Sequence, residues 1–347
     1  MKNNELRSSA PLISIIVPVF NRADEIDEFL SSLSDQTNRN FDVNIIDDGS
    51  EDNLKQVVSK YEKQLSISYF HQQNQGPGKA RNLGMSKAKG DYFVFIDSDC
   101  SFPNNYIENL ADHILKNDFD VFGGPDTCRD DFPDFLKAVN FSMTSFIGTG
   151  GARGTTGKSV TKYYPRSFNM GIKREVYDKI GGMNELRHGQ DMDFSNRIYK
   201  AGFKVKYLPD VVVYHKRRTD LRRFFKQIFN WGVARINLGK IDKSMLKPVH
   251  SLPAVVLFLF LLTVFFSLFS KMFRKVLLLE CAAALFTSIF VLIQSGKKHR
   301  SFKVGILSVV TLFTQIIAYG SGFTTGKIKS VFSREKFVKG FTKKYYR

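Results

Sequence analysis

Blocks of apolar and polar positions alternate along the first 215 residues and predict strands and helices in turn. Runs rich in Ile, Val and Phe predict buried strands at 12–20, 41–46, 67–71 and 92–96. Apolar residues at helical spacing predict a helix at 23–35. A second helix is predicted at 54–65, and a basic helix that opens with Gly-Pro-Gly is predicted at 76–89. Strands that alternate with helices favour an α/β fold with a parallel sheet, in which ligands bind at the carboxyl ends of the strands.

The pattern is less regular after the fourth strand. Short helices are predicted at 174–180 and 190–201, and strand-like runs lie between 205 and 214. Residues 148–157 (GTGGARGTTG) are rich in glycine, which predicts a mobile loop and a candidate lid.

The chain changes character at residue 216. Arg and Lys stand beside Phe, Ile and Trp at 217–240, which predicts an amphipathic helix along a membrane surface; a solvated helix is the alternative. Apolar runs follow at 251–270, 276–293 and 304–326. About 20 apolar residues span a bilayer core, so we expect two or three membrane spans, with buried core helices as the alternative.

The membrane topology is awkward because basic segments flank the second apolar run on both sides and the tail is basic too. Three simple spans cannot place all of these segments on one side, as the positive-inside rule asks. A hairpin combined with a re-entrant or interfacial segment would ease the conflict.

The charge and the cysteines narrow the class of protein. The formal net charge is +18, which suits anionic lipid, phosphorylated substrates or nucleic acid. No zinc-finger spacing or nucleic-acid module stands in the sequence, so lipid and phosphate are favoured. Three widely spaced cysteines form no disulfide framework, and the first residues lack the apolar core of a signal peptide. We therefore expect the N-terminal half in the cytoplasm.

Two acidic clusters follow predicted strands. Asp97-Ser98-Asp99 places two carboxylates within reach of one hard cation, Mg²⁺ or Mn²⁺, which would neutralise charge on a departing diphosphate. The cluster Asp47-Asp48-Gly49-Ser50 places carboxylates where they could accept hydrogen bonds from a nucleobase or a ribose. A solvated acidic turn for the first cluster and an Asx-type turn for the second are the alternatives.

A glycine turn precedes the third helix. Gly76-Pro77-Gly78 is followed by Lys79 and Arg81, and helix N-termini and Arg side chains bind phosphate well. The alternative is a basic solvated helix.

Six ordered motifs together resemble the family 2 glycosyltransferases with a GT-A fold, over roughly residues 11–235. They are VPVFNRADEI (17–26), IIDDGSEDN (45–53), NQGPGKARNLGM (74–85), FIDSDC (95–100), FNMGIKREVYDKIGGMNE (168–185) and HGQDMDFSNRIYKAGF (188–203). The resemblance implies an inverting transferase with a Rossmann-like nucleotide-diphospho-sugar domain and a divalent metal.

The resemblance also implies roles for single residues. Asp191 would be the general base, and Asp99 would hold the metal with His215, although a structural His is an equal alternative. The donor would be bound by Pro18, Phe20, Asn21, Asp47, Asp48, Arg81 and Asp97. The acceptor would be contacted by Asn169, Gln190 and Trp231. For Asp191 the alternative is an acid favoured by the helix dipole, and for Trp231 it is an interfacial anchor.

Two positions depart from the family pattern. Gln190 stands where the family usually has Glu, which keeps hydrogen bonding but removes a charge. Gln227 to Trp231 resembles the QxxRW signature of processive members, but Asn230 replaces the Arg. This replacement argues against a full synthase of the cellulose or hyaluronan type.

The sequence thus predicts a multi-pass membrane glycosyltransferase (EC 2.4) with its catalytic domain in the cytoplasm. It would move a sugar from a nucleotide-sugar, by preference a UDP-sugar, to a glycolipid or polysaccharide acceptor. The expected parts are a GT-A domain at 1–215, a basic interfacial segment at 216–248, a membrane region at 249–326 and a basic tail at 327–347. The alternatives are transfer to a polyprenyl phosphate, a non-catalytic sugar-nucleotide or membrane scaffold and, weakest, a nucleic-acid binder.

Overall fold

The computed structural model describes residues 11–150, 163–217, 219–332 and 336–341. These fall into two compact units. The α/β unit comprises the described residues of 1–129 and 151–216, and the helical unit those of 130–150 and 217–344. Residues 130–150, which the sequence placed with the first domain, therefore belong with the helices. Most of the predicted glycine-rich lid, from residue 151 on, lies outside the described residues.

A seven-stranded sheet forms the centre of the α/β unit, with the order β3-β2-β1-β4-β8-β6-β9. Its strands are β1 (Ile13–Val19), β2 (Phe41–Asp47), β3 (Ile67–His71), β4 (Tyr92–Phe95), β6 (Val121–Gly123), β8 (Met170–Lys173) and β9 (Val205–Tyr207). The first four run parallel, but β8 is antiparallel to both β4 and β6. The predicted parallel sheet is therefore mixed, because a strand buried on both faces has the same apolar pattern in either direction.

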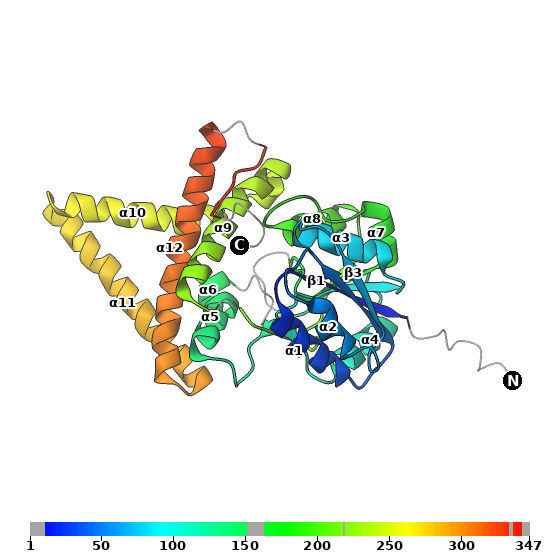
Figure 1. Cartoon of the computed structure of the whole chain (residues 1–347). Helices are drawn as coiled ribbons and strands as arrows, with labels where there is room; N and C mark the ends of the chain where they lie inside the picture. The colour runs from blue at the N-terminus through cyan, green and yellow to red at the C-terminus, as the bar shows by residue number, and fades with distance from the viewer. Residues whose placement is uncertain (1–10, 151–162, 218, 333–335, 342–347) are drawn as a thin grey trace. The chain divides into compact units, whose positions relative to one another are not determined.

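Helices cover both faces of this sheet (Figure 1). Along β1, Ile15 and Val17 point to one core and Ile16 to the other, as the alternation of a strand requires. The first core is closed by α1 (Ala23–Ser34), α2 (Leu54–Ser59) and α4 (Tyr106–Lys116). The second is closed by α3 (Pro77–Lys87), α7 (Arg174–Ile180) and α8 (Gln190–Lys200). The predicted helix at 54–65 ends early, at Ser59, and turns follow it.

The α/β unit also contains a second sheet, of three strands, whose first strand follows β4 in the sequence. It consists of β5 (Cys100–Ser101), β10 (Val213–His215) and β7 (Asp126–Thr127), with β10 in the middle. Its strands are only two or three residues long, so it contributes little core. It does bring three distant segments of the chain to one place.

The helical unit contains three helices long and apolar enough to cross a membrane, at Pro248–Ser267, Lys271–His299 and Phe302–Phe332. They include α10 (Leu252–Ser267), α11 (Lys271–His299) and α12 (Phe302–Phe332). Only 6% of the most apolar window of each of the first two is buried, so their apolar side chains face outward. In Figure 1 the three helices enclose a triangle and do not form a bundle of parallel spans.

Two of the remaining helices, α5 (Asp134–Thr144) and α9 (Leu221–Ile241), pack on α12. The short helix α6 (Phe146–Thr149) packs on α5, and the 3-10 turns η1 (Lys243–Met245) and η2 (Pro248–Ser251) pack on α9 and α10. The helix predicted at 217–240 is thus α9, and its apolar residues Phe224 and Ile228 are buried against α5 and α12. Its apolar face is filled by protein, so contact of α9 with lipid remains a prediction.

Candidate active site

The carboxyl ends of β1 and β2 are tied together by hydrogen bonds. Asn21 has a positive φ of 51°, and its backbone amide donates to Ser50 Oγ at 2.9 Å. Its side-chain Oδ1 accepts from the amide of Glu51 at 2.8 Å. Pro18 is the last residue but one of β1, whose ladder with β2 ends at Val19, and Phe20 follows the strand half-buried. The three residues predicted to line a nucleoside pocket therefore stand beside the Asp47–Ser50 turn.

Asp47 holds that turn. One of its carboxylate oxygens accepts from the amide of Ser50 at 2.8 Å, and the other accepts from the Tyr69 hydroxyl at 2.5 Å. Burial, together with the Asp47 carboxylate, raises the pKa of Tyr69 well above its usual value, so the phenol stays a donor. Asp47 thus acts as the hydrogen-bond acceptor of an Asx-type turn, and its contact with a nucleotide-sugar remains a prediction.

Asp48 connects β2 to the start of α3. It is 1% exposed, and its carboxylate accepts three hydrogen bonds. The donors are Gln72 Nε2 at 2.6 Å, the Gln75 amide at 2.9 Å and the Gly76 amide at 2.8 Å. A carboxylate is needed here because the two backbone donors converge on it from the loop that precedes α3.

Arg81 on α3 pairs with Asp97, the residue that follows β4 by two positions. Arg81 Nη2 donates to Asp97 Oδ1, and the side chains are 6% and 33% exposed. Because Asp97 is partly open, the pair leaves carboxylate surface at the end of the sheet. The sequence predicted both residues at a donor site, and the structure brings them together.

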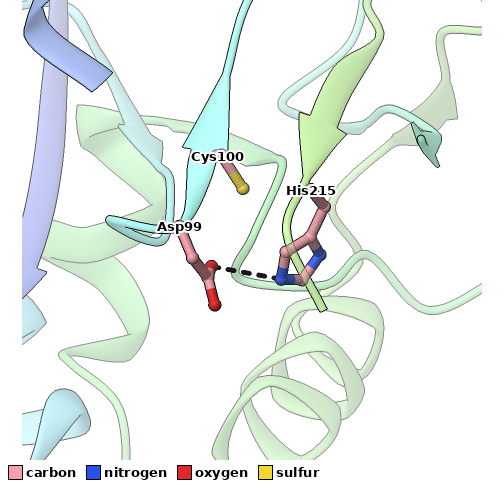
Figure 2. A group of neighbouring side chains, drawn as sticks. All are labelled: Asp99, Cys100 and His215. Atoms are coloured by element: carbon pink, nitrogen blue, oxygen red, sulfur yellow. Dashed lines mark ion pairs between the residues drawn. The ribbon is translucent and has the colours of Figure 1, made fainter. Parts of the chain in front are cut away.

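Asp99 and His215 face each other across the small sheet (Figure 2). His215 Nε2 lies 3.1 Å from Asp99 Oδ1, and the side chains are 13% and 12% exposed. Candidate ligand atoms of Asp99, Cys100 and His215 all lie within 4.8 Å of one another. A carboxylate oxygen and an imidazole nitrogen at this spacing fit a divalent cation such as Mn²⁺. Burial raises the pKa of the Cys100 thiol, which therefore stays protonated and a poor ligand.

Asp191 and Asp193 start α8 but point to different surroundings. Asp193 is 1% exposed and binds Asn184 Nδ2 at 2.7 Å and Arg197 Nε at 3.1 Å, so it holds the fold. The Asp191 side chain is 24% exposed, and its Oδ2 lies 3.6 Å from Arg166 Nη1. Of the two acids, Asp191 is the one whose carboxylate is partly open to solvent, and its role as general base remains a prediction.

The first turn of α3 joins the two halves of the site. A Cβ added at Gly78 would lie 2.3 Å from Gln190 Nε2, so the side chain next to Asp191 packs directly on that turn. Three residues later, Arg81 on the same helix holds Asp97. Asp97 and Asp191, far apart in the sequence, are therefore linked through one turn of helix.

The predicted acceptor residues occupy different places. Gln190 is buried against Gly78. Asn169 is fully buried, binds the carbonyls of Pro125 and Val211 and accepts from Tyr106 Oη. Contact of either amide with an acceptor remains a prediction.

Trp231 lies on α9 in the helical unit, half-buried, so its contact with an acceptor is also a prediction. The adjacent Asn230 accepts from the Phe341 amide at 2.9 Å. At the position of the signature arginine, the chain thus uses a side chain that binds its own C-terminal segment.

Sequence reasoning missed two side chains of this site, Asp126 and Arg166. Asp126 follows the sequence Gly-Gly-Pro and is 3% exposed, and its Oδ2 lies 3.1 Å from His215 Nδ1. Neither residue stands in a recognisable spacing with its partner, so only the folded chain reveals the pairs.

A mixed α/β sheet with acidic side chains at the carboxyl ends of β2 and β4 is typical of GT-A-type nucleotide-sugar transferases. Comparison with known proteins agrees. The profile "Glycosyl transferase family 2" matches residues 14–181. The glycosyltransferase AglE of Haloferax volcanii is 26% identical over 265 residues, which cover 74% of this chain and 83% of AglE. Residues 14–181 thus match the family 2 glycosyltransferases, and the protein is a glycosyltransferase that transfers a sugar from a nucleotide-sugar.

Two further similarities bear on the fold and the function. The succinoglycan biosynthesis protein ExoA of Rhizobium meliloti is 26% identical over 241 residues, which cover 68% of this chain and 72% of ExoA. A mannosyltransferase of Pyrobaculum calidifontis, solved with GDP-mannose and Mn²⁺, superimposes with a TM-score of 0.62 at 17% identity. It covers 94% of this chain and 89% of its own, which confirms the GT-A-like fold followed by apolar helices.

Proposed function

We propose that the chain is an inverting, metal-dependent glycosyltransferase that moves a sugar from a UDP-sugar to a glycolipid or polysaccharide at the cytoplasmic face of a membrane. The observation that carries this proposal is the turn of α3 that links Asp97, through Arg81, to the residue beside Asp191. The proposed reaction needs one carboxylate near the nucleotide-sugar donor and another near the acceptor hydroxyl. Asp97 and Asp191 would fill these two places.

The residues take separate roles in this proposal. Pro18, Phe20 and Asn21 line the nucleoside side with the Asp47–Asp48 turn, and Arg81 and Asp97 lie at the donor. Asp99 and His215 would hold Mg²⁺ or Mn²⁺, which when bound neutralises negative charge on the leaving diphosphate. Asp191 takes the proton of the acceptor hydroxyl as that oxygen attacks the anomeric carbon from the side opposite the diphosphate.

The membrane part of the proposal is supported by the three long apolar helices of the helical unit. An apolar anchor beside a transferase suits an acceptor that is itself held at a membrane. The name of ExoA, a polysaccharide biosynthesis protein, is consistent with such an acceptor. In this proposal residues 1–215 without 130–150 carry the chemistry, 216–248 lie at the interface, 249–326 span the membrane and 327–347 form a basic tail.

A second acceptor class has one observation in its favour. Arg166 Nη1 lies 3.6 Å from Asp191, so a cation stands beside the proposed base. Arg binds phosphate well, and a polyprenyl phosphate would bring its own negative charge to this place.

The test is sugar transfer by membranes that contain the full chain, with a panel of UDP- and GDP-sugars, with and without EDTA. We expect turnover of one donor, loss of turnover with EDTA and recovery with Mn²⁺ or Mg²⁺. The anomeric configuration of the product should be opposite to that of the donor. Turnover unaffected by EDTA would contradict the proposed metal dependence. A product with the same anomeric configuration as the donor would contradict the inverting mechanism. Stronger transfer to a polyprenyl phosphate than to glycolipid or polysaccharide would favour the second acceptor class.

A further inference from the structure

The small sheet β5-β10-β7 brings His215 between two acidic side chains, Asp99 and Asp126. On one side β10 pairs antiparallel with β5, with His215 opposite Cys100, the residue after Asp99. On the other side β10 pairs parallel with β7, with Val213 opposite Asp126. The imidazole therefore stands between two acidic residues that are 27 positions apart in the sequence.

Each ring nitrogen of His215 faces one carboxylate. Nε2 lies 3.1 Å from Asp99 Oδ1, and Nδ1 lies 3.1 Å from Asp126 Oδ2. Phe168 packs on the ring with the centroids 5.2 Å apart, which limits its rotation. The Asp126 side chain is 2% exposed, against 12% for Asp99, so Asp126 lies on the protein side of the ring and Asp99 on the more open side.

A histidine that binds a metal does so through an unprotonated nitrogen, and the proton must then sit on the other one. A carboxylate that accepts this N–H fixes both the tautomer and the direction of the ring. We propose that Asp126 is a positioning residue that holds the His215 proton on Nδ1, keeps Nε2 unprotonated so that it can join Asp99 as a ligand, and so sets the metal affinity of the site. The inference rests on the proposed metal-dependent function.

The proposed role of Asp126 can be distinguished by experiment from a purely structural role. An Asn at position 126 has nearly the same shape, but its amide can donate to Nδ1. The proton would then move to Nε2, the ligand atom, and the metal site would lose a donor although the fold is kept. A merely structural role predicts no such change in metal binding.

The experiment is an EPR titration of Mn²⁺ alone against the full chain in detergent, for the wild type, Asp126→Asn and the matched control Asp118→Asn. Asp118 is an exposed carboxylate of the same unit that pairs with Lys204. We expect Asp126→Asn to weaken Mn²⁺ binding about 10- to 100-fold, as outer-shell changes do, with an unchanged thermal midpoint. Asp118→Asn should bind like the wild type. Equal Mn²⁺ affinity in the folded Asp126→Asn protein would overturn the inference.

A second measurement covers the case in which Asp126→Asn does not fold. The ¹⁵N shifts of the wild-type histidines with saturating Mg²⁺ report the tautomers, and the His215→Gln variant assigns the His215 signal. We expect the Nδ1–H tautomer; the Nε2–H tautomer would refute the role of Asp126. If the wild type binds no Mn²⁺ while transfer proceeds in EDTA, the proposed metal function itself fails, which is a different result.

Discussion

Arg81 and Asp97 form an ion pair in which the guanidinium is almost fully buried and the carboxylate is one-third open. An arginine held in this way cannot move far, so it fixes the direction of the Asp97 carboxylate at the end of β4. The pair couples the start of α3 to the acidic cluster, and with it to the donor side of the proposed site.

Replacing Arg81 by Gln should weaken both the fold and donor binding. Breaking a fully buried pair costs about 3–5 kcal/mol, but Asp97 is partly solvated, so we expect about 2 kcal/mol. Thermal unfolding in detergent and equilibrium binding of the donor measure the two effects. Arg81→Lys keeps the charge without the planar guanidinium, so its stability and donor affinity should lie between those of the wild type and Arg81→Gln. Lys79→Gln, on the same helix but 42% exposed, should leave the thermal midpoint unchanged.

The Asp48→Asn variant tests whether the carboxylate holds the loop before α3. One carboxylate oxygen would be replaced by an NH₂ group that faces N–H donors, so at least one buried donor would lose its acceptor. Such a loss costs about 1–3 kcal/mol. Urea unfolding should show it, and Glu51→Gln, exposed in the same turn, should not. An unchanged midpoint for Asp48→Asn would mean that the three hydrogen bonds contribute no net stability.

The sequence was sufficient for the strands before the acidic clusters because their apolar runs are buried on both faces. No strand was predicted at β8, because its four residues, MGIK, are too few to show a strand pattern, and its antiparallel direction was therefore missed too. The sequence also placed 130–150 with the first domain, because the apolar side chains of α5 can equally cover a sheet or pack on α12. The Asp99–His215 pair followed from a family resemblance, whereas Asp126 and Arg166 lie far in sequence from their partners and carry no spacing signal.

Asp191→Asn tests the general base. The amide keeps the shape and the hydrogen bond to the Met192 amide but cannot take a proton, so the rate of sugar transfer should fall about 10²- to 10⁴-fold. Donor affinity should not change, which separates loss of the base from loss of the site. Asp178→Asn, exposed on α7, is the control. Full transfer by Asp191→Asn would favour a phosphate acceptor, which needs no base, or a different base.

His188, three residues before Asp191, should make the α/β unit sensitive to acid. Burial, with the neighbouring Arg187, lowers the pKa of His188 to about 4. The unfolded chain takes up this proton near pH 6.5, so stability is complete above that pH and falls as the pH drops towards 4. We expect up to about 2 kcal/mol of this loss at pH 5. Within the described residues His188 Nε2 has no hydrogen-bond partner that would favour the protonated ring.

The measurement for His188 is the difference in thermal midpoint between pH 7 and pH 5, for the wild type and for His188→Gln. Gln cannot titrate in this range, so the variant should lose less stability than the wild type over the same interval. Equal losses would show that His188 is solvated in the folded chain. The comparison cancels the contributions of the other histidines and of the carboxylates, which both proteins share.

The crossing of α9 and α12 depends on glycines that let the two backbones touch. A Cβ at Gly322 would lie 2.0 Å from the carbonyl oxygen of Phe229, and one at Gly232 would lie 2.4 Å from that of Tyr319. Both obstacles are backbone atoms, which cannot rotate away. Gly322→Ala should therefore separate the helices and destabilise the helical unit by about 1–3 kcal/mol, as other overpacked sites do.

Gly296→Ala on α11 is the matched control for this crossing, because the new Cβ would meet only Ser301 O at 3.5 Å, an ordinary contact. Ala is the better helix former by about 1 kcal/mol, so Gly296→Ala should be neutral or stabilising. Gly322→Ala gains the same propensity and should still lower the thermal midpoint of the purified chain in detergent. If the two variants had equal midpoints, the helices would have to separate at no cost, and close backbone packing would not hold α9 against α12.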